Sequence, residues 1–265
     1  MPSGPSPRGA AGALTGPHAA LRAGVVWEVL RQALQDRAAA AGRQELDVLD
    51  TGGGSGSLAV PVAGLGHRVT VVDPSPDALF ALERRAGEEG VAGRVRAVQG
   101  DTQDLLEVAG AGAFDLVLCH GVLEYVEDPA AALRSVAGAL RPAGGTLSLL
   151  TAGVGGAVLA RALAGRFTEA RRALGDPAGR WGGADPLPRR FTPAALTALV
   201  AEAGLVPGPV HGVRIFADLV PGSLVDTEPE ALQELTRLEA EAAGRPAFQA
   251  VAAQLHVRAE VPDEM

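Results

Sequence analysis

The residues best suited to chemistry lie in one acidic, glycine-rich stretch, Leu46-Asp-Val-Leu-Asp-Thr-Gly-Gly-Gly-Ser-Gly56. An apolar segment ends there at Asp50 and runs directly into a turn. Because glycine has no Cβ, such a turn lets the backbone pass close beneath a ligand. We therefore expect a nucleotide-type cofactor to contact Asp50, Gly52, Gly53, Gly54 and Gly56. The turn alone leaves the cofactor open, because Gly54-x-Gly56-x-x-Ala59 also fits the dinucleotide fingerprint.

Polar residues also follow the next three apolar segments. Asp73 ends the segment Arg68-Val-Thr-Val-Val, where a carboxylate can bind a ribose diol held over the first turn. Asp101, Thr102 and Gln103 follow the third segment and would face an adenine edge. His120 and Tyr125 come after the fourth segment, where we expect the reactive part of the cofactor and the acceptor. No metal is expected at this site.

The elements that must position these residues alternate between strand and helix patterns, which is typical of a parallel α/β sheet. We predict an N-terminal amphipathic helix over 18–37 and a helix that begins after the N-cap Asp128. Predicted strands are 46–51, 68–73, 94–99, 114–120, 146–151, 210–219 and 254–261. Predicted helices are 56–65, 76–89, 103–109, 192–203 and 228–243. Residues 153–190 break this rhythm and predict an inserted helical cap.

Composition limits the classes of protein. The chain has 265 residues, of which 47% are hydrophobic and 3% aromatic, enough for one domain with a substantial core. We predict a disordered tail over 1–13 and a single domain over 14–265, with no membrane-spanning segment. The single cysteine, Cys119, rules out an internal disulfide framework and favours a cytoplasmic protein.

Missing residue types exclude specific chemistry. All 23 basic residues are arginine, so neither a lysine Schiff base to pyridoxal phosphate nor a phosphate-binding lysine of Walker type can form.

The stretches at 46–56, 68–73, 95–104 and 114–125 together resemble the motif series of class I methyltransferases that use S-adenosylmethionine (SAM). The resemblance implies a Rossmann-like α/β fold. It implies a seven-stranded, mostly parallel sheet whose last strand is antiparallel, an arrangement that dinucleotide-binding domains lack. It also implies SAM as the cofactor. Some of these enzymes hold an exocyclic amine with an Asn-Pro-Pro-Tyr-type loop, but this chain has no asparagine. With one cysteine and no Pro-Cys pair, methylation of carbon through a covalent cysteine adduct is disfavoured, so oxygen, carboxylate and thiol acceptors remain.

Further motifs narrow the resemblance to the tRNA 5-carboxymethoxyuridine methyltransferase family over about residues 18–260. They are Leu21-Arg22 with Trp27, Gly66-His-x-Val69, His120-x-Val-Leu-Glu, Gly212-Val-Arg-Ile-Phe-x-Asp218 and Leu255-His-Val257. The family implies methyl transfer to a uridine-linked carboxylate at the tRNA wobble position, which gives a methyl ester. By that resemblance, SAM contacts Arg22, Gly52, Gly53, Asp73 and His120, and its adenine lies near the backbone of Thr102 and Gln103.

Three observations bear on the acceptor. Tyr125 is a candidate lining residue of the acceptor pocket. Arg214 lies in an otherwise apolar segment, so its partner is either an acidic substrate or an internal carboxylate such as Asp218. The cap carries more arginines than acids on a chain of net charge −8, which suits tRNA phosphates but also fits a solvated surface.

Two other functions stay open. The acceptor is alternatively the oxygen or sulfur of a small molecule, if the cap cannot admit a nucleotide. A SAM-binding protein without turnover is the other alternative. The sequence assigns no role to Glu124 or His211.

Overall fold

The computed structural model describes residues 17–142, 144–221 and 229–262, with side chains from residue 26 onward and except at Pro229. The predicted tail over 1–13 lies outside these residues. The strands are β1 Asp47–Thr51, β2 Arg68–Asp73, β3 Val95–Gln99, β4 Leu116–His120, β5 Thr146–Ala152, β6 Val206–Val213 and β7 Gln254–Glu260. The helices are α1 Pro17–Ala41, α2 Ala59–Gly64, α3 Pro76–Glu88, α4 Leu105–Ala109, α5 Pro129–Ala139, α6 Val154–Leu163, α7 Phe167–Gly175, α8 Pro193–Glu202, α10 Pro229–Ala243 and α11 Pro246–Gln249. Short 3₁₀ helices span Ala92–Arg94 and Thr102–Asp104.

The strands form a seven-stranded sheet in the order β3-β2-β1-β4-β5-β7-β6. β7 is antiparallel to both of its neighbours, and the other strands run parallel to one another. The predicted class I fold with an antiparallel last strand is therefore confirmed. Chain order reverses between β1 and β4, and ligands of open α/β sheets bind beyond the carboxyl ends of strands at such a point.

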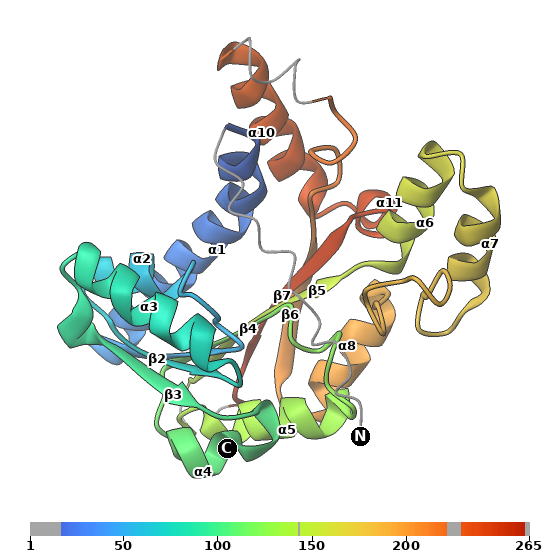
Figure 1. The fold of residues 1–265 in the computed structure, drawn as a ribbon. Coiled ribbons are helices and arrows are strands. Elements are labelled where there is room, and N and C mark those ends of the chain that lie inside the picture. The colour runs from blue at the N-terminus through green and yellow to red at the C-terminus, as the bar shows by residue number, and fades with distance from the viewer. Residues whose placement is uncertain (1–16, 143, 222–228, 263–265) are drawn as a thin grey trace.

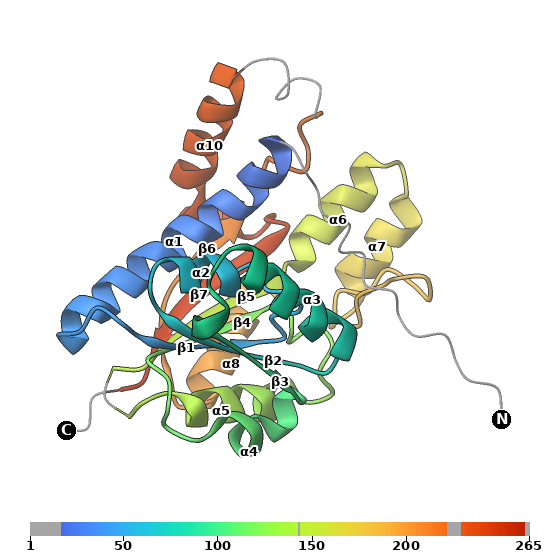
Figure 2. The ribbon, with the colours of Figure 1, turned by 60° about the vertical axis from the view of Figure 1, so that its left-hand side comes forward.

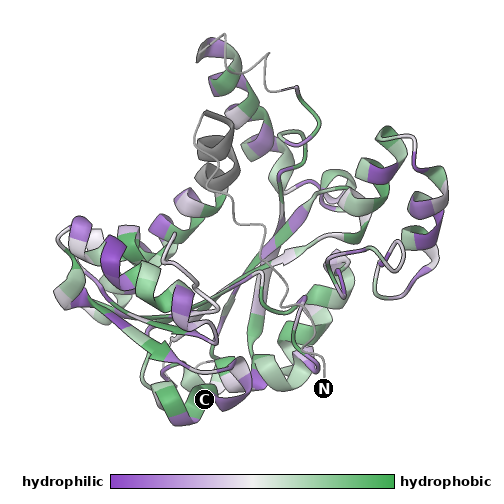
Figure 3. Cartoon of the chain, in the orientation of Figure 1, coloured by the Kyte–Doolittle hydropathy of each residue, from purple (hydrophilic) through white to green (hydrophobic). Residues whose placement is uncertain are grey.

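Helices cover both faces of this sheet, as Figures 1 and 2 show. The alternation along β4 divides the core, because Leu116 and Leu118 pack with α1, α2 and α3, whereas Val117 and Cys119 pack with α4, α5 and α8. Figure 3 shows mostly hydrophobic colouring along the central strands and hydrophilic residues on the outer helices. The predicted cap, residues 153–190, is inserted between β5 and α8 and contains α6 and α7 (Figure 1).

The helix starts follow local capping chemistry. Ser75, Asp128 and Thr192 each accept backbone hydrogen bonds at the first turn of α3, α5 and α8, and each is followed by a proline at the first helical position. These caps fix where each helix begins after the strand or segment that precedes it.

The predicted strand over 210–219 was wrong in its bounds. β6 begins at Val206, and a bulge between Pro207 and Val210 accommodates the two prolines of this edge strand. The apolar residues that followed were mistaken for strand. Instead, the buried carboxylate of Glu239 on α10 accepts hydrogen bonds from the backbone nitrogens of Ile215, Phe216 and Ala217, at 3.0, 2.8 and 2.7 Å. These nitrogens are therefore satisfied without a strand partner.

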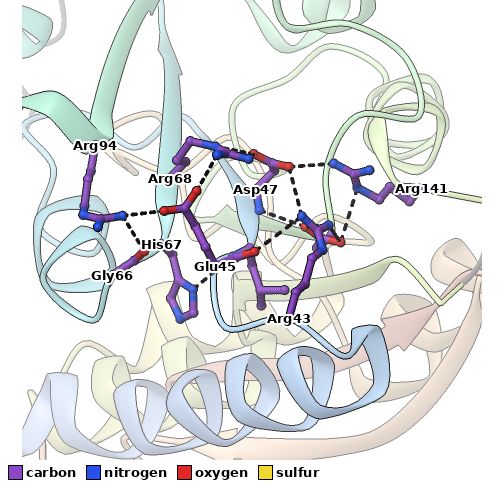
Figure 4. Close-up of polar contacts among 10 residues, drawn as sticks. Arg43, Glu45, Asp47, Gly66, His67, Arg68, Arg94 and Arg141 are labelled. Atoms are coloured by element: carbon purple, nitrogen blue, oxygen red, sulfur yellow. Dashed lines mark hydrogen bonds and ion pairs between the residues drawn. The ribbon is translucent and has the colours of Figure 1, made fainter.

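Arginine–carboxylate pairs join the elements at the amino ends of the strands, opposite the glycine turn. Asp115 is fully buried and accepts from Arg43 and, at 2.8 Å, from the backbone nitrogen of Asp47. Asp47 also pairs with Arg141 at 2.6 Å and with Arg68 at 2.8 Å. Figure 4 shows how these residues, with Glu45 and Arg94, form one continuous network. We call this the amino-end network.

Candidate cofactor and acceptor site

A pocket of about 480 Å³ opens at the carboxyl ends of β1 to β4. It contains many of the residues that the sequence singled out, and brings together segments that lie far apart in the chain. Its lining consists of Gly52, Val72, Asp73, Pro74, Gly100, Asp101, Thr102, Gln103, Gly121, Val122, Tyr125, Val126 and Glu127. The pocket lies where the strand order reverses between β1 and β4, which is where open α/β sheets bind their ligands.

The glycine turn has the backbone conformation that its sequence requires. Gly52, Gly54 and Gly56 have φ angles of 68°, 55° and 78°, which side chains other than glycine rarely adopt. An added Cβ on Gly52 would lie 2.6 Å from Val122 Cγ2, and one on Gly56 would lie 2.2 Å from Leu82 Cδ1. The turn is therefore a close-packed cradle, and Gly52 lines the pocket on the side where we expect the ligand.

Asp73 holds the two sides of this cradle together. Its Oδ2 accepts a hydrogen bond from the backbone nitrogen of Gly54 at 2.9 Å, and its Oδ1 accepts one from Ser75 at 2.9 Å. The carboxylate is 8% exposed and lines the pocket. Two carboxylate oxygens offer about four acceptor positions, so capacity remains for ligand hydroxyl groups.

Asp50 lies beneath the turn, does not line the pocket and is 3% exposed. An added Cβ on Gly53 would lie 2.5 Å from the Asp50 carboxyl, so the two residues are in close contact. Burial, and then the charge of Asp73, raise the pKa of Asp50 from 3.8 to about 7. The structure thus places Asp50 as a support of the turn rather than on its ligand side.

Replacing Asp50 by asparagine is expected to change how stability depends on pH. The pKa of Asp50 is higher in the folded state than in the unfolded state, so the folded protein binds an extra proton between these two values. The stability that this proton contributes is lost as pH rises toward 7. The advantage of Asp50→Asn should therefore grow with pH, by up to about 1.4 kcal/mol per pH unit between about pH 4 and 7. Chemical denaturation of both proteins across this range measures the difference. Parallel stability profiles would contradict the raised pKa.

Asp101, Thr102 and Gln103 form the third side of the pocket. Asp101 caps the short 3₁₀ helix by accepting a hydrogen bond from the backbone nitrogen of Gln103 at 3.1 Å. Thr102 is buried, and its hydroxyl lies 3.2 Å from the hydroxyl of Thr51 at the end of β1. Sequence reasoning had not included Thr51, because nothing local distinguishes it from a strand residue.

His120 ends β4 and takes part in a buried chain of three side chains. Its Nε2 lies 2.9 Å from Ser148 Oγ, which lies 2.9 Å from Nε2 of His256. Burial lowers the pKa of His120 to about 4 and that of His256 to about 3, so both rings are neutral near pH 7. Since the serine has one hydroxyl proton, it donates to one ring and accepts from the other, and the two imidazoles are opposite tautomers.

This arrangement leaves Nδ1 of His120 buried without a hydrogen-bond partner in the described part of the chain. His120 does not itself line the pocket, although the adjacent Gly121 does. No local pattern predicts Ser148 or His256 as partners of His120, because the contact depends on the pairing of β4, β5 and β7.

Two neighbouring residues of the loop after β4 differ in exposure. Tyr125 is 62% exposed and lines the pocket at its rim. Glu124 is buried, and its Oε1 accepts a hydrogen bond from the backbone nitrogen of Ala152 at 2.6 Å. This bond ties the loop to the end of β5. Burial raises the pKa of Glu124.

Arg22 lies in α1, but its side chain is outside the part that the structure describes. Arg214 was expected inside a strand, and that placement is wrong. It follows β6 with a φ of 57°, and its Nε and Nη2 donate to Asp218 at 3.1 and 2.5 Å. The internal carboxylate that the sequence offered as one alternative is thus in contact with the guanidinium, and Arg214 does not line the cofactor pocket.

Arg214→Lys is expected to lower the melting temperature by a few degrees while turnover per folded molecule stays within about twofold of wild type. The reason is that lysine keeps the charge but loses the two-pronged pair with Asp218. Asp218→Asn serves as the matched variant and should behave alike. Thermal unfolding and single-turnover rates test both. A tenfold loss of turnover in Arg214→Lys alone would instead assign Arg214 to the acceptor.

The arginines of the cap differ in their contacts. Arg189 donates to the backbone oxygens of Leu123 and Glu127, both at 3.3 Å, and to that of Val126, so it holds the cap against the pocket rim. Arg190 is buried and pairs with Asp185 at 2.7 Å, a contact within the cap. Arg171, Arg172 and Arg180 are exposed and line a separate hollow.

Comparisons with known proteins agree with this geometry. Residues 49–147 match the model of a methyltransferase domain family. A protein of Escherichia coli K12 described as tRNA 5-carboxymethoxyuridine methyltransferase is 30% identical over 242 residues, which cover 91% of this chain and 88% of that protein. A ubiquinone biosynthesis O-methyltransferase of Caulobacter vibrioides is 39% identical over 110 residues, 42% of each chain.

Solved structures show the same fold at low identity. A SAM-dependent methyltransferase of Methanosarcina mazei has a TM-score of 0.57 at 18% identity, covering 84% of this chain and 95% of that one. A putative sarcosine dimethylglycine methyltransferase of Galdieria sulphuraria has a TM-score of 0.56 at 16% identity, with 89% and 87% covered. Within the described residues, no helix is long and apolar enough to cross a membrane.

Proposed function

The chain belongs to the class I SAM-dependent methyltransferases, and within them to the family of tRNA 5-carboxymethoxyuridine methyltransferase, so we propose that it methylates a carboxylate on a tRNA nucleoside. The enzyme uses SAM as methyl donor. The proposed acceptor is the carboxylate of 5-carboxymethoxyuridine, and the product is its methyl ester. A tRNA acceptor implies a cytoplasmic site of action.

The shape of the pocket supports SAM binding. Side chains at Gly52 or Gly56 would fill the cradle or collide with its walls, which is the condition for a ligand that lies against backbone. In the proposed arrangement, the carboxylate of Asp73 accepts from the ribose hydroxyls. Asp101, Thr102 and Gln103 surround the adenine, and Arg22 and His120 contact the methionine part.

The acceptor chemistry places modest demands on the protein. SAM supplies a methyl group on a sulfonium, and a carboxylate is ionised near pH 7 without help from a base. The residues therefore act mainly by orienting the acceptor in line with the methyl group. Tyr125 at the rim and the unpartnered Nδ1 of His120 are the groups we assign to that task.

The single observation that carries this proposal is the relationship to the E. coli enzyme over 88% of its length. Because it covers 91% of this chain, the relationship extends beyond residues 49–147 into the cap and the last strands. A small-molecule O-methyltransferase is the second candidate. It is favoured by the higher, 39% identity to the ubiquinone biosynthesis enzyme, but that likeness covers only 42% of either chain.

Mass spectrometry of tRNA nucleosides from cells with and without this protein tests the proposal. The methyl ester of 5-carboxymethoxyuridine should disappear in its absence, and the free carboxylate should accumulate. Purified enzyme with SAM should restore the ester in that tRNA. Unchanged nucleosides in the cells, together with no transfer to the tRNA in vitro, would favour a small-molecule acceptor.

A further inference from the structure

The cap contains a hollow of about 600 Å³ that is separate from the cofactor pocket. Arg171 and Arg172 of α7 form one side of it, and Arg180 with Gly182 and Gly183 forms the other. The guanidinium of Arg172 reaches across to the loop, since an added Cβ on Gly182 would lie 3.7 Å from Arg172 Nη1. Three arginines thus line one concave surface.

The far wall of the hollow is held in place by buried contacts. The ring of Trp181 lies 4.6 Å from the guanidinium carbon of Arg161 on α6 and is 8% exposed. The backbone nitrogen of Trp181 donates to Asp185 at 2.9 Å, and Asp185 pairs with Arg190 at 2.7 Å. The loop is therefore a fixed wall rather than a freely moving segment.

Asp176 also lines the hollow and pairs with Arg180 at 3.6 Å, so this acid offsets only part of the positive charge. Arg171 and Arg172 are both exposed and have no acidic partner among the described residues, although the chain has more acidic than basic residues and a net charge of −8. Such a cluster of guanidinium groups suits phosphate oxygens, which accept two parallel hydrogen bonds from arginine.

An apolar surface lies beside these arginines on α7. Phe167 and Leu174 are each 71% exposed, and with Arg171 they follow the spacing of one helix face. A solvated helix surface does not need two large apolar side chains at that exposure. An aromatic ring next to arginines is the combination on which unpaired nucleic-acid bases stack while their phosphates are bound.

We propose that this hollow is a phosphodiester-binding site for the RNA substrate, with Arg171 and Arg172 contacting phosphates and Phe167 stacking on an unpaired base. The inference rests on the proposed function for the identity of its ligand, and adds where on this chain the RNA is held. Arg189 joins the cap to the rim of the cofactor pocket, so RNA bound at the hollow lies on the element that borders the reaction site.

The chain supplies its own matched control on α3. Phe80-Ala-Leu-Glu-Arg84-Arg85 repeats the spacing of Phe167-Thr-Glu-Ala-Arg171-Arg172, and Phe80 is also 71% exposed. On α3, however, Arg84 pairs with Glu88 at 3.1 Å, and neither arginine lines the hollow of the cap. Equivalent substitutions on α3 and α7 therefore change charge and exposed apolar area equally.

The test measures binding of an unmodified anticodon stem-loop RNA by fluorescence anisotropy over a series of salt concentrations. Arg171→Gln/Arg172→Gln should raise the Kd at least about tenfold near 0.1 M salt and lower the salt slope by about 2. Phe167→Ala should raise the Kd about tenfold but leave the slope unchanged, because stacking displaces no counterions. Phe80→Ala and Arg84→Gln/Arg85→Gln should stay within about twofold of wild type.

Methylation and SAM affinity are measured on the same variants, so that the two proposals can fail separately. If the wild type methylates tRNA but the α7 and α3 variants behave alike, the hollow is not the RNA site and the proposed function stands. If the α7 variants lose RNA binding but no tRNA is methylated, the acceptor is wrong and the hollow stands. A wild type that binds no RNA overturns the inference. SAM affinity should be unchanged in all four variants.

Discussion

Asp73→Ala should weaken SAM binding roughly 10- to 150-fold, corresponding to the loss of about 1.5–3 kcal/mol from hydrogen bonds to a charged acceptor. The carboxylate lines the pocket and is mostly buried, so water cannot replace it well in the ribose site. Part of the loss will come from the cradle itself, since Asp73 also binds the backbone nitrogens of Gly54 and Ser75.

Two further variants separate these contributions. Asp73→Asn keeps one oxygen acceptor for the cradle but loses the charge, so it should fall between wild type and Asp73→Ala. Asp77→Ala removes an exposed carboxylate in the first turn of α3, which does not line the pocket, and should leave SAM affinity within about twofold. Calorimetric titration with SAM, S-adenosylhomocysteine and NAD measures all of them, with no binding of NAD expected. Unchanged SAM affinity in Asp73→Ala would remove Asp73 from the proposed site.

Gly53→Ala is expected to disrupt the cofactor site and the fold together. The added Cβ would lie 2.5 Å from the Asp50 carboxyl and 2.9 Å from Val71 Cγ1, and neither neighbour can retreat because both are buried. Overpacking of this kind costs about 1–3 kcal/mol of folding stability. Because relief requires the turn itself to shift beneath the ligand, we also expect SAM affinity to fall by at least about tenfold.

Gly87→Ala is the control for this substitution. Gly87 lies in α3 with nothing within 4 Å of an added Cβ, so alanine there should stabilise the helix by about 0.5–1 kcal/mol and leave SAM binding unchanged. Urea unfolding and calorimetry on both variants provide the comparison. Normal SAM binding in a stably folded Gly53→Ala protein would mean that the turn tolerates a side chain and is not a close-fitting cradle.

The first five strands could be predicted from sequence because local patterns decide them. β2 was predicted with the bounds observed, since an apolar run is bounded by Arg68 and Asp73 and followed by the cap at Ser75. The bounds of β6 were misplaced because the local sequence pattern was misleading there and the interaction that decides the backbone conformation comes from a distant helix. Pro207 and Pro209 argued against a strand, whereas an edge strand tolerates them, and Glu239 satisfies the backbone of 215–217 from a distant helix.

The candidate site likewise contains residues that the local sequence places and contacts that it does not. Gly52, Asp73 and Asp101 occur directly at strand ends, so their position in a shared pocket follows from the order of parallel strands. His120 was placed correctly at the end of β4, but its partners Ser148 and His256 come from strands whose neighbours the sequence does not specify. For Arg190 and Arg214, counting charge could not reveal that each already binds an aspartate of this chain.

The amino-end network has a consequence for alkaline conditions. Every cation in it is a guanidinium, a group that as a class keeps its proton to pH 12 and beyond, whereas a lysine ammonium loses its proton near pH 10.4. A lysine-based network would release its buried carboxylate Asp115 as the solution became alkaline. In this chain the same contacts persist in base, so the amino ends of the strands should stay joined at a pH where a lysine-based network would have separated.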